Sequence, residues 1–318
     1  MQVIELPAPR FWPDSLGFSP DGRLLAVWEQ SRTVVIGPDG SVRQLAEHLH
    51  SQDTRATRNP AVGFTADGQG VVALHIGYKP GGGAVEEIRV YDVGTGEVKQ
   101  SQPCWYGSPL AFGPKNQWVY TRVSDRGIGI LRWNPLTGET LPVFGKSGHD
   151  IFQIAVSGDG HTVVASIFES VRVLRFRGDK PPSRASKVLP GEPTHSFAAL
   201  AASSDGRFVA ATGQHVHVWD VESGIRQTIA TDVNKPTSKP VPLPGNAFGR
   251  EIEFHPTKPL LAFNAGAGEV VFWDVSAQHE LKRYAWGIGS ITAIAFSPDG
   301  LRCAAAGNSK VVVWDVDV

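Results

Sequence analysis

A short turn sequence recurs along the chain, and this recurrence limits the possible folds more than any other feature. Five copies place an Asp-Gly pair shortly after an apolar residue, at residues 18–22, 64–68, 156–160, 202–206 and 296–300. Two further segments, residues 112–116 and 254–258, occupy the same frame with different turn residues. The seven turns begin 42 to 52 residues apart, so the chain consists of seven similar units in series.

Each unit carries the pattern of antiparallel β-strands. A run that alternates large and small residues, such as Leu16-Gly17-Phe18, precedes the turn, and a run rich in aliphatic residues follows it. A third run ends on an aromatic–acid pair in several units, such as Tyr91-Asp92 and Trp219-Asp220, and a glycine-containing turn leads to a fourth run. Four strands per unit and a period of about 40–45 residues are typical of propeller blades. The sequence therefore predicts an all-β fold, a seven-bladed β-propeller with four-stranded antiparallel blades.

These units resemble the WD repeat, and the resemblance covers essentially the whole chain. The aromatic–acid pair is Trp-Asp in three units, and it is weakened to Ile36-Gly37 in the first and Leu174-Arg175 in the fourth. The family's polar network uses a histidine before the first strand, where this chain has residues such as Pro103 and Gly245. The resemblance implies a divergent WD-repeat propeller that relies on apolar packing and backbone ladders, and it implies a protein or peptide partner.

The two ends of the chain predict how the ring closes. The seventh unit reaches its third strand at Val311-Val312-Val313-Trp314 and has no residues left for a fourth strand. An unpaired outer edge would expose backbone donors and acceptors. Residues 2–6 have strand character, so we predict that they complete the seventh blade. We expect a single propeller domain over residues 1–318.

Composition and charge exclude several classes of partner. The chain has 30 Lys and Arg against 31 Asp and Glu, which gives no broad basic surface for nucleic acid. No apolar run is long enough for a membrane helix. Cys104 and Cys303 are far apart in sequence and lack metal-type spacing, which fits a reducing compartment. We therefore expect a cytoplasmic protein that is a monomer by itself and binds neither nucleic acid nor membrane.

No motif for catalysis, a cofactor or a metal is evident, so we expect a non-enzymatic protein without a cofactor. His215 and His217, like His48 and His50, alternate along the chain and would need a third ligand to hold a metal. Glu251 and Glu253 stand where other units have mainly small or uncharged residues, and they either bind a cation or form a local ion pair. The alternative function uses the mouth of the propeller's central channel. There the protein would act as an enzyme or bind a metal or small ligand.

The segments between the fourth strand of one unit and the first strand of the next are rich in aromatic residues. In WD-repeat propellers these segments open onto the face where partners commonly dock. Aromatic and arginine side chains frequently dominate binding hot spots. Phe152 and Phe197 lie nearest the core strands, and we expect them to pack the blades instead. The residues predicted to bind are Trp12, Arg58, Trp105, Tyr106, Phe248, Arg250 and Trp286.

The sequence thus favours a protein–protein or peptide-binding scaffold that uses the aromatic-rich channel face. Three irregular segments, residues 75–87, 178–193 and 231–249, either shape partner choice or are tolerated insertions. The chain is also compatible with an interaction domain of a larger signalling or enzymatic assembly. The identity of the partner stays open, because a fold does not fix a function.

Overall fold

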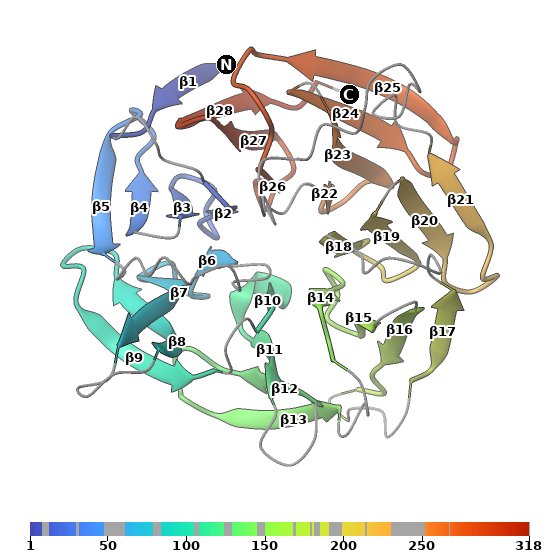
Figure 1. Ribbon diagram of the computed structural model, residues 1–318, viewed down its shortest axis with the longest axis horizontal. Coiled ribbons are helices and arrows are strands. Elements are labelled where there is room, and N and C mark those ends of the chain that lie inside the picture. The colour runs from blue at the N-terminus through green and yellow to red at the C-terminus, as the bar shows by residue number, and fades with distance from the viewer. Residues whose placement is uncertain are drawn as a thin grey trace.

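The predicted ring of β-sheets is confirmed by the structure. The computed structural model describes residues 1–7, 13–29, 32–47, 61–78, 84–104, 108–123, 129–144, 150–167, 170–178, 180, 185–190, 199–213, 215–229, 252–266 and 268–317. These residues form seven four-stranded antiparallel sheets, which are the blades of a propeller around a central axis (Figure 1). Within these ranges, the chain forms no helix that is long and apolar enough to cross a membrane.

Each blade has four strands, named a to d from the axis outward. Blades 1 to 7 contain these strands in that order: β2 (Ser15–Phe18), β3 (Leu25–Glu29), β4 (Arg32–Ile36) and β5 (Val42–Glu47); β6 (Val62–Phe64), β7 (Gly70–Tyr78), β8 (Ala84–Asp92) and β9 (Val98–Pro103); β10 (Leu110–Phe112), β11 (Val119–Val123), β12 (Gly129–Trp133) and β13 (Thr140–Phe144); β14 (Gln153–Val156), β15 (Thr162–Ile167), β16 (Ser170–Arg175) and β17 (Lys187–Pro190); β18 (Ala199–Ala202), β19 (Phe208–Thr212), β20 (Val216–Asp220) and β21 (Arg226–Ile229); β22 (Ile252–Phe254), β23 (Leu260–Gly266), β24 (Glu269–Asp274) and β25 (His279–Ala285); β26 (Ala293–Phe296), β27 (Arg302–Gly307), β28 (Lys310–Asp315) and β1 (Gln2–Glu5).

The repeated turn lies between strands a and b, and every strand a ends on the residue that begins this turn. In blade 5, the Ser203 hydroxyl donates a 2.7 Å hydrogen bond to Asp205 Oδ1, which also accepts one from the Arg207 backbone N–H at 3.0 Å. Gly206 has a φ of +67°, a conformation that favours glycine. The same serine or threonine bond to aspartate recurs at residues 19 and 21, 65 and 67, 157 and 159, and 297 and 299. The Asp-Gly pattern is thus the sequence requirement of one turn geometry.

The aromatic–acid pair serves the turn between strands c and d. In blade 5, Trp219 is fully buried, and Asp220 Oδ1 accepts hydrogen bonds of 3.0 Å from the backbone N–H groups of Glu222 and Ser223. Equivalent bonds form at Asp92, Asn134 and Asp274. The aromatic residue therefore packs the core while the acid closes the turn.

The amino-terminal strand closes the ring as predicted. Strand β1 pairs antiparallel with β28, with Gln2 opposite Val313 and Glu5 opposite Lys310. The Leu6 backbone N–H extends this pairing with a 2.8 Å hydrogen bond to the Ser309 carbonyl oxygen. The two ends of the chain therefore supply neighbouring strands of one blade, and β1 lies beside β28 in Figure 1.

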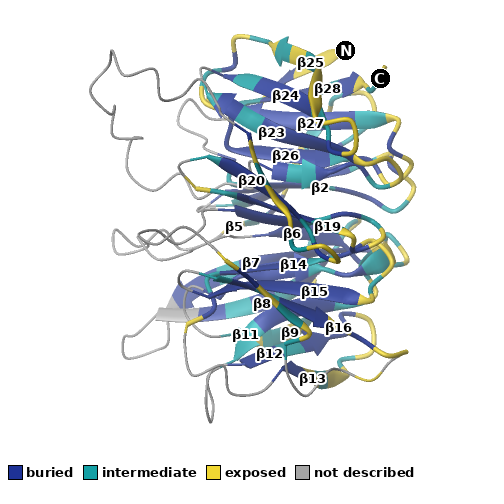
Figure 2. Ribbon diagram, turned by 90° about the vertical axis from the view of Figure 1, so that its right-hand side faces the viewer, coloured by how far each residue is buried: buried dark blue, intermediate teal, exposed yellow. Residues whose placement is uncertain are grey.

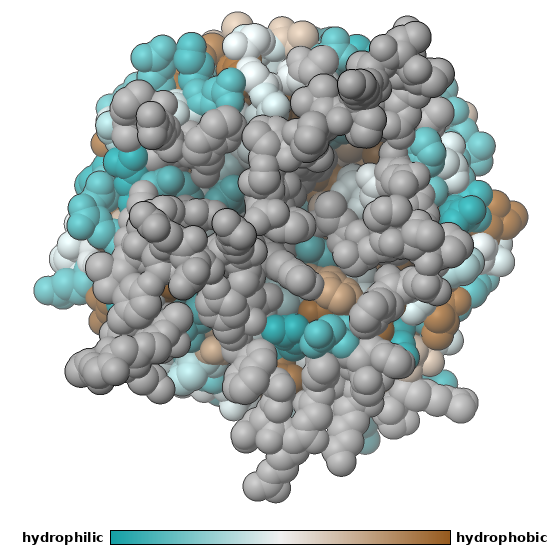
Figure 3. Space-filling view, viewed as in Figure 1, coloured by the Kyte–Doolittle hydropathy of each residue, from teal (hydrophilic) through white to brown (hydrophobic). Residues whose placement is uncertain are grey.

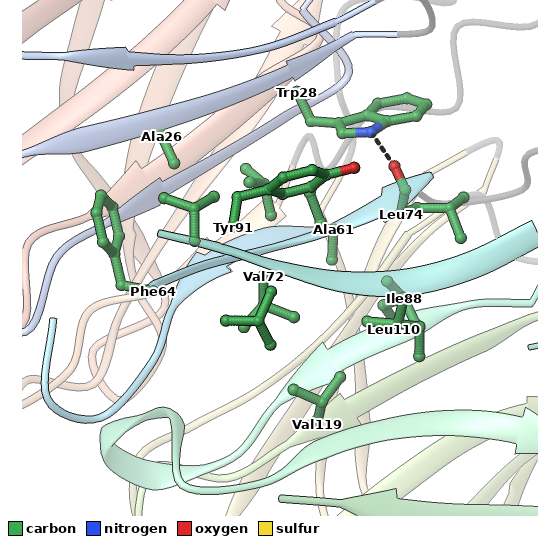
Figure 4. Packing of buried hydrophobic residues seen from close by; sticks show 14 of the residues in the cluster. Ala26, Trp28, Ala61, Phe64, Val72, Leu74, Ile88, Tyr91, Leu110 and Val119 are labelled. Carbon is green, nitrogen blue, oxygen red and sulfur yellow. Dashed lines mark hydrogen bonds between the residues drawn. The ribbon is translucent and has the colours of Figure 1, made fainter. Parts of the chain in front are cut away.

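Apolar side chains fill the space between adjacent blades. Trp28 of blade 1 is fully buried, and its Nε1 donates a 2.8 Å hydrogen bond to the Leu74 carbonyl oxygen of blade 2 (Figure 4). Near the axis, the first strands approach so closely that a Cβ atom on Gly17 would lie 2.4 Å from the Val62 carbonyl oxygen. This contact explains the small residue before the end of strand a.

The family's polar network is weak here, in agreement with the sequence. Among the described residues, the buried Nε1 atoms of Trp273 and Trp314 have no hydrogen-bond partner. Figure 2 shows that buried residues run through the inner strands of the ring while exposed residues gather at its turns. These two tryptophans therefore stabilise the ring through apolar packing and not through hydrogen bonds.

The ring has two faces that differ in the connections they carry. The a–b and c–d turns lie on one side, which we call the turn face. The ends of the strands that lead into the b–c and d–a connections lie on the other side, the connection face, which is turned toward the viewer in Figure 1 and lies at the left in Figure 2.

Two of the segments expected to be irregular contain regular strands. Strands β7 and β8 stay paired as far as Tyr78 and Ala84, so residues 75–78 and 84–87 belong to a long hairpin. In blade 4, β17 (Lys187–Pro190) is an ordinary strand d that pairs with β16. These residues form strands because a partner strand lies beside them. Their loop-like sequences do not show that such a partner is present. Residues 231–249 lie outside the described residues.

Candidate interaction surfaces

Most of the residues predicted to bind lie outside the described residues. These are Trp12, Arg58, Trp105, Tyr106, Phe248 and Arg250. The strand ends that flank their segments are described, and they lie at the connection face; for example, β9 ends at Pro103 and β10 begins at Leu110. The binding roles of these six residues stay predictions.

Trp286 is described, and it lies between blades 6 and 7. Its ring stacks on that of Tyr284, with a centroid separation of 5.2 Å and an interplanar angle of 9°. Its ring centroid is 4.2 Å from that of Trp314 on β28. Strand β28, which carries Trp314, is two strands away from the innermost strand β26. The Trp286 side chain is partly buried. Trp286 therefore packs the junction between these blades, and its role in binding stays a prediction.

Two other singled-out positions lie close to the innermost strands. Phe152 is partly buried beside β14, and its backbone N–H donates a 3.0 Å hydrogen bond to the Ser166 carbonyl oxygen. Glu253 is partly buried on β22, whereas Glu251 and Phe197 lie outside the described residues. Burial raises the pKa of the Cys303 thiol, and the nearby Glu253 carboxylate adds to this increase. Glu253 thus faces blade 7.

The histidine pair does not assemble a metal site within the described chain. His217 is buried, and its Nδ1 lies 3.1 Å from Thr228 Oγ1. The His215 and His217 ring centroids are 6.2 Å apart. In the part of the chain that the structure describes, no group of three or more His, Cys, Asp or Glu residues could hold a metal ion. His217 instead packs against Trp219, at a centroid separation of 5.7 Å. His48 and His50 lie outside the described residues.

Charged residues pair along the strand ends of the connection face. Arg32 Nε lies 3.1 Å from Glu29 Oε1 across the ends of β3 and β4. Arg122 NH1 lies 3.3 Å from Asp150 Oδ1, which links blade 3 to blade 4. Figure 3 shows this face, on which described residues around the rim are mainly hydrophilic with small separate apolar spots. A polar rim of this kind is typical of interaction surfaces.

Two groups on this side have strongly shifted pKa values. Burial raises the pKa of Asp14 to about 7, and the nearby Glu29 carboxylate adds to the increase. Burial lowers the pKa of His75 to about 4, with a smaller contribution from Arg89. His75 Nδ1 lies 3.2 Å from the Tyr91 hydroxyl. Asp14 therefore changes charge near neutral pH, whereas His75 stays neutral there.

The turn face has a pocket that the sequence did not predict. It lies between blades 4 and 5 and has a volume of about 360 Å³. Its lining includes Arg175 from the end of β16, Arg207 from the a–b turn of blade 5 and the buried ring of Phe176. The sequence signal was present: Leu174-Arg175 stands where other blades have an aromatic–acid pair. By itself, this difference indicates only a weakened repeat.

Comparisons with known proteins agree with the ring. The family model described as "WD domain, G-beta repeat" matches residues 283–315. Pre-mRNA-processing factor 19 homolog 2 of Arabidopsis thaliana is 24% identical over 190 residues, which are 57% of this chain and 33% of that protein. The chain therefore spans about a third of the length of this relative. A chain from "Crystal Structure of Mitotic Checkpoint Complex" superimposes with a TM-score of 0.67 at 15% identity, over 99% of this chain and 91% of that chain. Together with the seven repeated turns and the closed ring, these similarities support a WD-repeat β-propeller.

Proposed function

We propose that this protein is a non-enzymatic scaffold that binds a protein or peptide partner on its connection face. One observation carries the proposal. Six of the seven segments that join strand d to the next strand a contain a large aromatic residue, and four of them carry the aromatic residues predicted to bind. The described strands that flank these segments all end on the same side of the ring.

The chemistry of these residues supports a protein partner. WD40 propellers are typically protein-interaction scaffolds. Trp and Arg side chains bury a large area and keep a polar group for hydrogen bonds, so they dominate binding hot spots. We propose Trp12, Arg58, Trp105, Tyr106, Phe248, Arg250 and Trp286 as the residues that contact the partner. The pairs of Glu29 with Arg32 and of Arg122 with Asp150 would form part of the polar rim.

The charge balance and the relatives support the kind of partner. The chain has nearly equal numbers of acidic and basic residues, which favours a protein over nucleic acid. One similar structure is a chain of a complex, the mitotic checkpoint complex. We propose a cytoplasmic location and a monomeric state for the chain by itself.

Affinity measurements on single variants test the binding face. A partner isolated from the native host with the full chain is titrated against Trp12→Ala and Trp105→Ala, and each change should weaken binding at least about tenfold. Ile225→Ala is the matched control, because Ile225 is 70% exposed in the c–d turn of blade 5, on the turn face. Its affinity should equal that of the unchanged chain.

Trp286→Ala needs a stability measurement beside the titration, because Trp286 packs against Tyr284 and Trp314. A weaker affinity with an unchanged melting temperature would support a binding role. The proposed face is wrong if Trp12→Ala and Trp105→Ala bind normally while Ile225→Ala does not.

A further inference from the structure

The pocket between blades 4 and 5 lies where an arginine, Arg175, replaces the usual acid at the end of strand c. Two equivalent sequence positions can be compared at each junction between blades: the acid position at the end of strand c, and the fifth residue after the end of strand a in the next blade. At the junction of blades 7 and 1 these residues are Asp315 and Arg23, and at the junction of blades 2 and 3 they are Asp92 and Gln117. The seven junctions have fourteen such positions, and all of them are described. Only at the junction of blades 4 and 5 are both residues arginine, namely Arg175 and Arg207.

The two guanidinium groups are accessible from the pocket. The side chain of Arg175 is 42% exposed, and that of Arg207 is 57% exposed. Arg207 Nε lies 3.0 Å from Asp220 Oδ2. Within the described part of the chain, neither the terminal nitrogens of Arg207 nor any nitrogen of the Arg175 side chain makes a hydrogen bond. Each arginine therefore has N–H donors available to a ligand.

Glu222 shows which chemistry the pocket attracts. Its carboxylate Oε1 lies 3.9 Å from Arg175 NH1, which is longer than a hydrogen bond, and its side chain is 73% exposed. A carboxylate is thus already drawn toward Arg175 without being fixed there. A carboxylate from a partner would replace it and gain hydrogen bonds to the guanidinium groups.

The other acids of the pocket belong to the turns. Asp159 Oδ1 accepts hydrogen bonds from the Ser157 hydroxyl at 2.5 Å and from the His161 backbone N–H at 2.9 Å. Asp205 makes the same bonds in blade 5. These acids recur in five blades, whereas the two arginines meet at one junction. The lining thus holds three carboxylates beside two guanidinium groups, and the feature that distinguishes this junction from the others is the pair of arginines.

The neighbouring c–d connection adds further positive charge and an apolar floor. Phe176 is buried, and its backbone N–H donates a 2.8 Å hydrogen bond to the His161 carbonyl oxygen. Arg177 follows it directly and pairs with Lys180 in an isolated bridge, and both side chains belong to exposed residues. The methylene groups of an inserted side chain could pack on Phe176 while its charged end reaches the arginines.

We infer that this pocket is a second docking site, which takes a glutamate or aspartate side chain from an acidic segment of a protein partner. The carboxylate binds between Arg175 and Arg207 and displaces Glu222. This site lies on the turn face, so it is independent of the scaffold function proposed for the connection face.

Peptide titrations with the full chain test the site. The probe is a fluorescein-labelled peptide of alternating Glu and Gly, with matched peptides that carry Gln or Lys in place of Glu, and binding is followed by fluorescence anisotropy. The Glu peptide should bind more tightly than the other two. Higher salt should weaken its binding, because partly exposed charges are screened over about 8–10 Å.

Variants of opposite expected effect identify the residues. Arg175→Gln and Arg207→Gln should each weaken binding of the Glu peptide about tenfold. Glu222→Gln should strengthen it severalfold, because the internal competitor is removed. Arg23→Gln is the matched control, since Arg23 has the same turn position in blade 1 while strand c of the preceding blade ends on Asp315 instead of an arginine, and it should bind like the unchanged chain. Melting temperatures check that each variant is folded, and Arg207→Lys replaces Arg207→Gln if the latter does not fold.

Two results would overturn the inference. The first is equal binding of the Glu and Gln peptides to the unchanged chain. The second is tighter binding of the Lys peptide, weakened by Glu222→Gln and strengthened by Arg175→Gln, which would make the pocket a site for a cation. Neither result depends on Trp12 or Trp105, so the failure of this site is distinguishable from the failure of the connection-face proposal.

Discussion

Lys187 on strand β17 of blade 4 donates a 2.6 Å hydrogen bond from its Nζ atom to the backbone carbonyl oxygen of Glu222, in the c–d turn of blade 5. Arg43 makes the same kind of contact from blade 1 to the Gly94 carbonyl oxygen of blade 2, at 3.1 Å. Lys282 of blade 6 reaches Asp317 Oδ1 beyond β28, at 2.7 Å. A polar side chain on the outermost strand thus ties one blade to the next.

These side chains stand at one register position. Arg43 is opposite Val35, Lys187 is opposite Val173 and Lys282 is opposite Phe272, and each opposite residue directly precedes the aromatic position of strand c. Gln100 has this position in blade 2, and Leu141 has it in blade 3. The repeat therefore supplies contacts between blades at the outer edge as well as near the axis.

Removing one of these contacts should have a small but measurable effect. Lys187→Ala should lower the free energy of unfolding by about 1 kcal/mol, since one hydrogen bond at an exposed site is lost. Chemical denaturation measures this change. Lys180→Ala is the control, because Lys180 is an exposed lysine of the same blade that makes only backbone contacts in the described chain, and it should leave stability unchanged. Equal effects of the two changes would contradict the role of Lys187.

Closure of the ring should depend on one face of β1. Ile4 is 6% exposed and packs against blades 7 and 1, whereas Val3 is 48% exposed. Ile4→Ala should cost about 2–4 kcal/mol of unfolding free energy, because it removes buried methyl and methylene groups. Val3→Ala should cost less than about 0.5 kcal/mol. Thermal and denaturant unfolding of both variants measure the difference.

Deletion of residues 1–6 extends this test. It removes the whole ladder between β1 and β28, so the loss should exceed that of Ile4→Ala. An unchanged melting temperature after the deletion would contradict the role of β1 in closing the ring.

Asp14 should make stability fall with rising pH. Its pKa is about 7 in the folded chain, compared with the usual 3.8, so the folded state binds an extra proton between these values. The free energy of unfolding therefore decreases as pH rises from 3.8 to about 7. Above this range the loss caused by ionised Asp14 has reached its full size. Asp14→Asn should raise the unfolding free energy above pH 7 by roughly 1–3 kcal/mol and have little effect at acidic pH.

Asp39→Asn is the control for this prediction. Hydrogen bonds from Ser41 lower the pKa of the exposed Asp39, so its neutralisation should bring no gain in stability above pH 7. The expectation for Asp14 is wrong if both variants, followed by denaturation over the pH range, show the same profile.

His255 should make stability fall at acidic pH. It occupies the position of the turn serine in blade 6, where Nδ1 accepts 3.1 Å hydrogen bonds from the Thr257 and Lys258 backbone N–H groups. Its Nε2 lies 3.0 Å from the Gly300 carbonyl oxygen of blade 7 and donates a hydrogen bond to it. Burial lowers the pKa of His255 below its usual 6.5, so protonation breaks this arrangement as pH falls.

His255→Ala should therefore cost about 1–3 kcal/mol above pH 6.5, and the difference from the unchanged chain should shrink at lower pH. The exposed His279 provides the control, because His279→Ala removes no buried contact. Denaturation of both variants across this pH range decides the matter, and a constant difference for His255→Ala would contradict the expected coupling.

The sequence predicted the number of blades because each blade repeats one turn. Ser203, Asp205 and Gly206 satisfy and shape that turn locally, so the pattern is visible without a neighbour. The closing strand was predictable for a related reason: the last unit lacks a strand, and residues 2–6 can form one. The binding residues on the connection face were also chosen from sequence, and for Trp12 and Trp105 they stay predictions.

Other features were decided only by the tertiary structure. Trp286 looked like a residue for a partner, but its surroundings include Trp314, which is distant in sequence and close in the ring. Arg175 looked like a weakened repeat, but its meeting with Arg207 depends on how two blades are placed side by side. The hydrogen bonds of the turns and the side-chain periodicity of the strands depend on residues that are close in sequence. The sequence by itself therefore determined the blades and their order. The contacts at each junction join strands of different blades, so only the folded ring decided which side chains are packed and which stay available to a ligand.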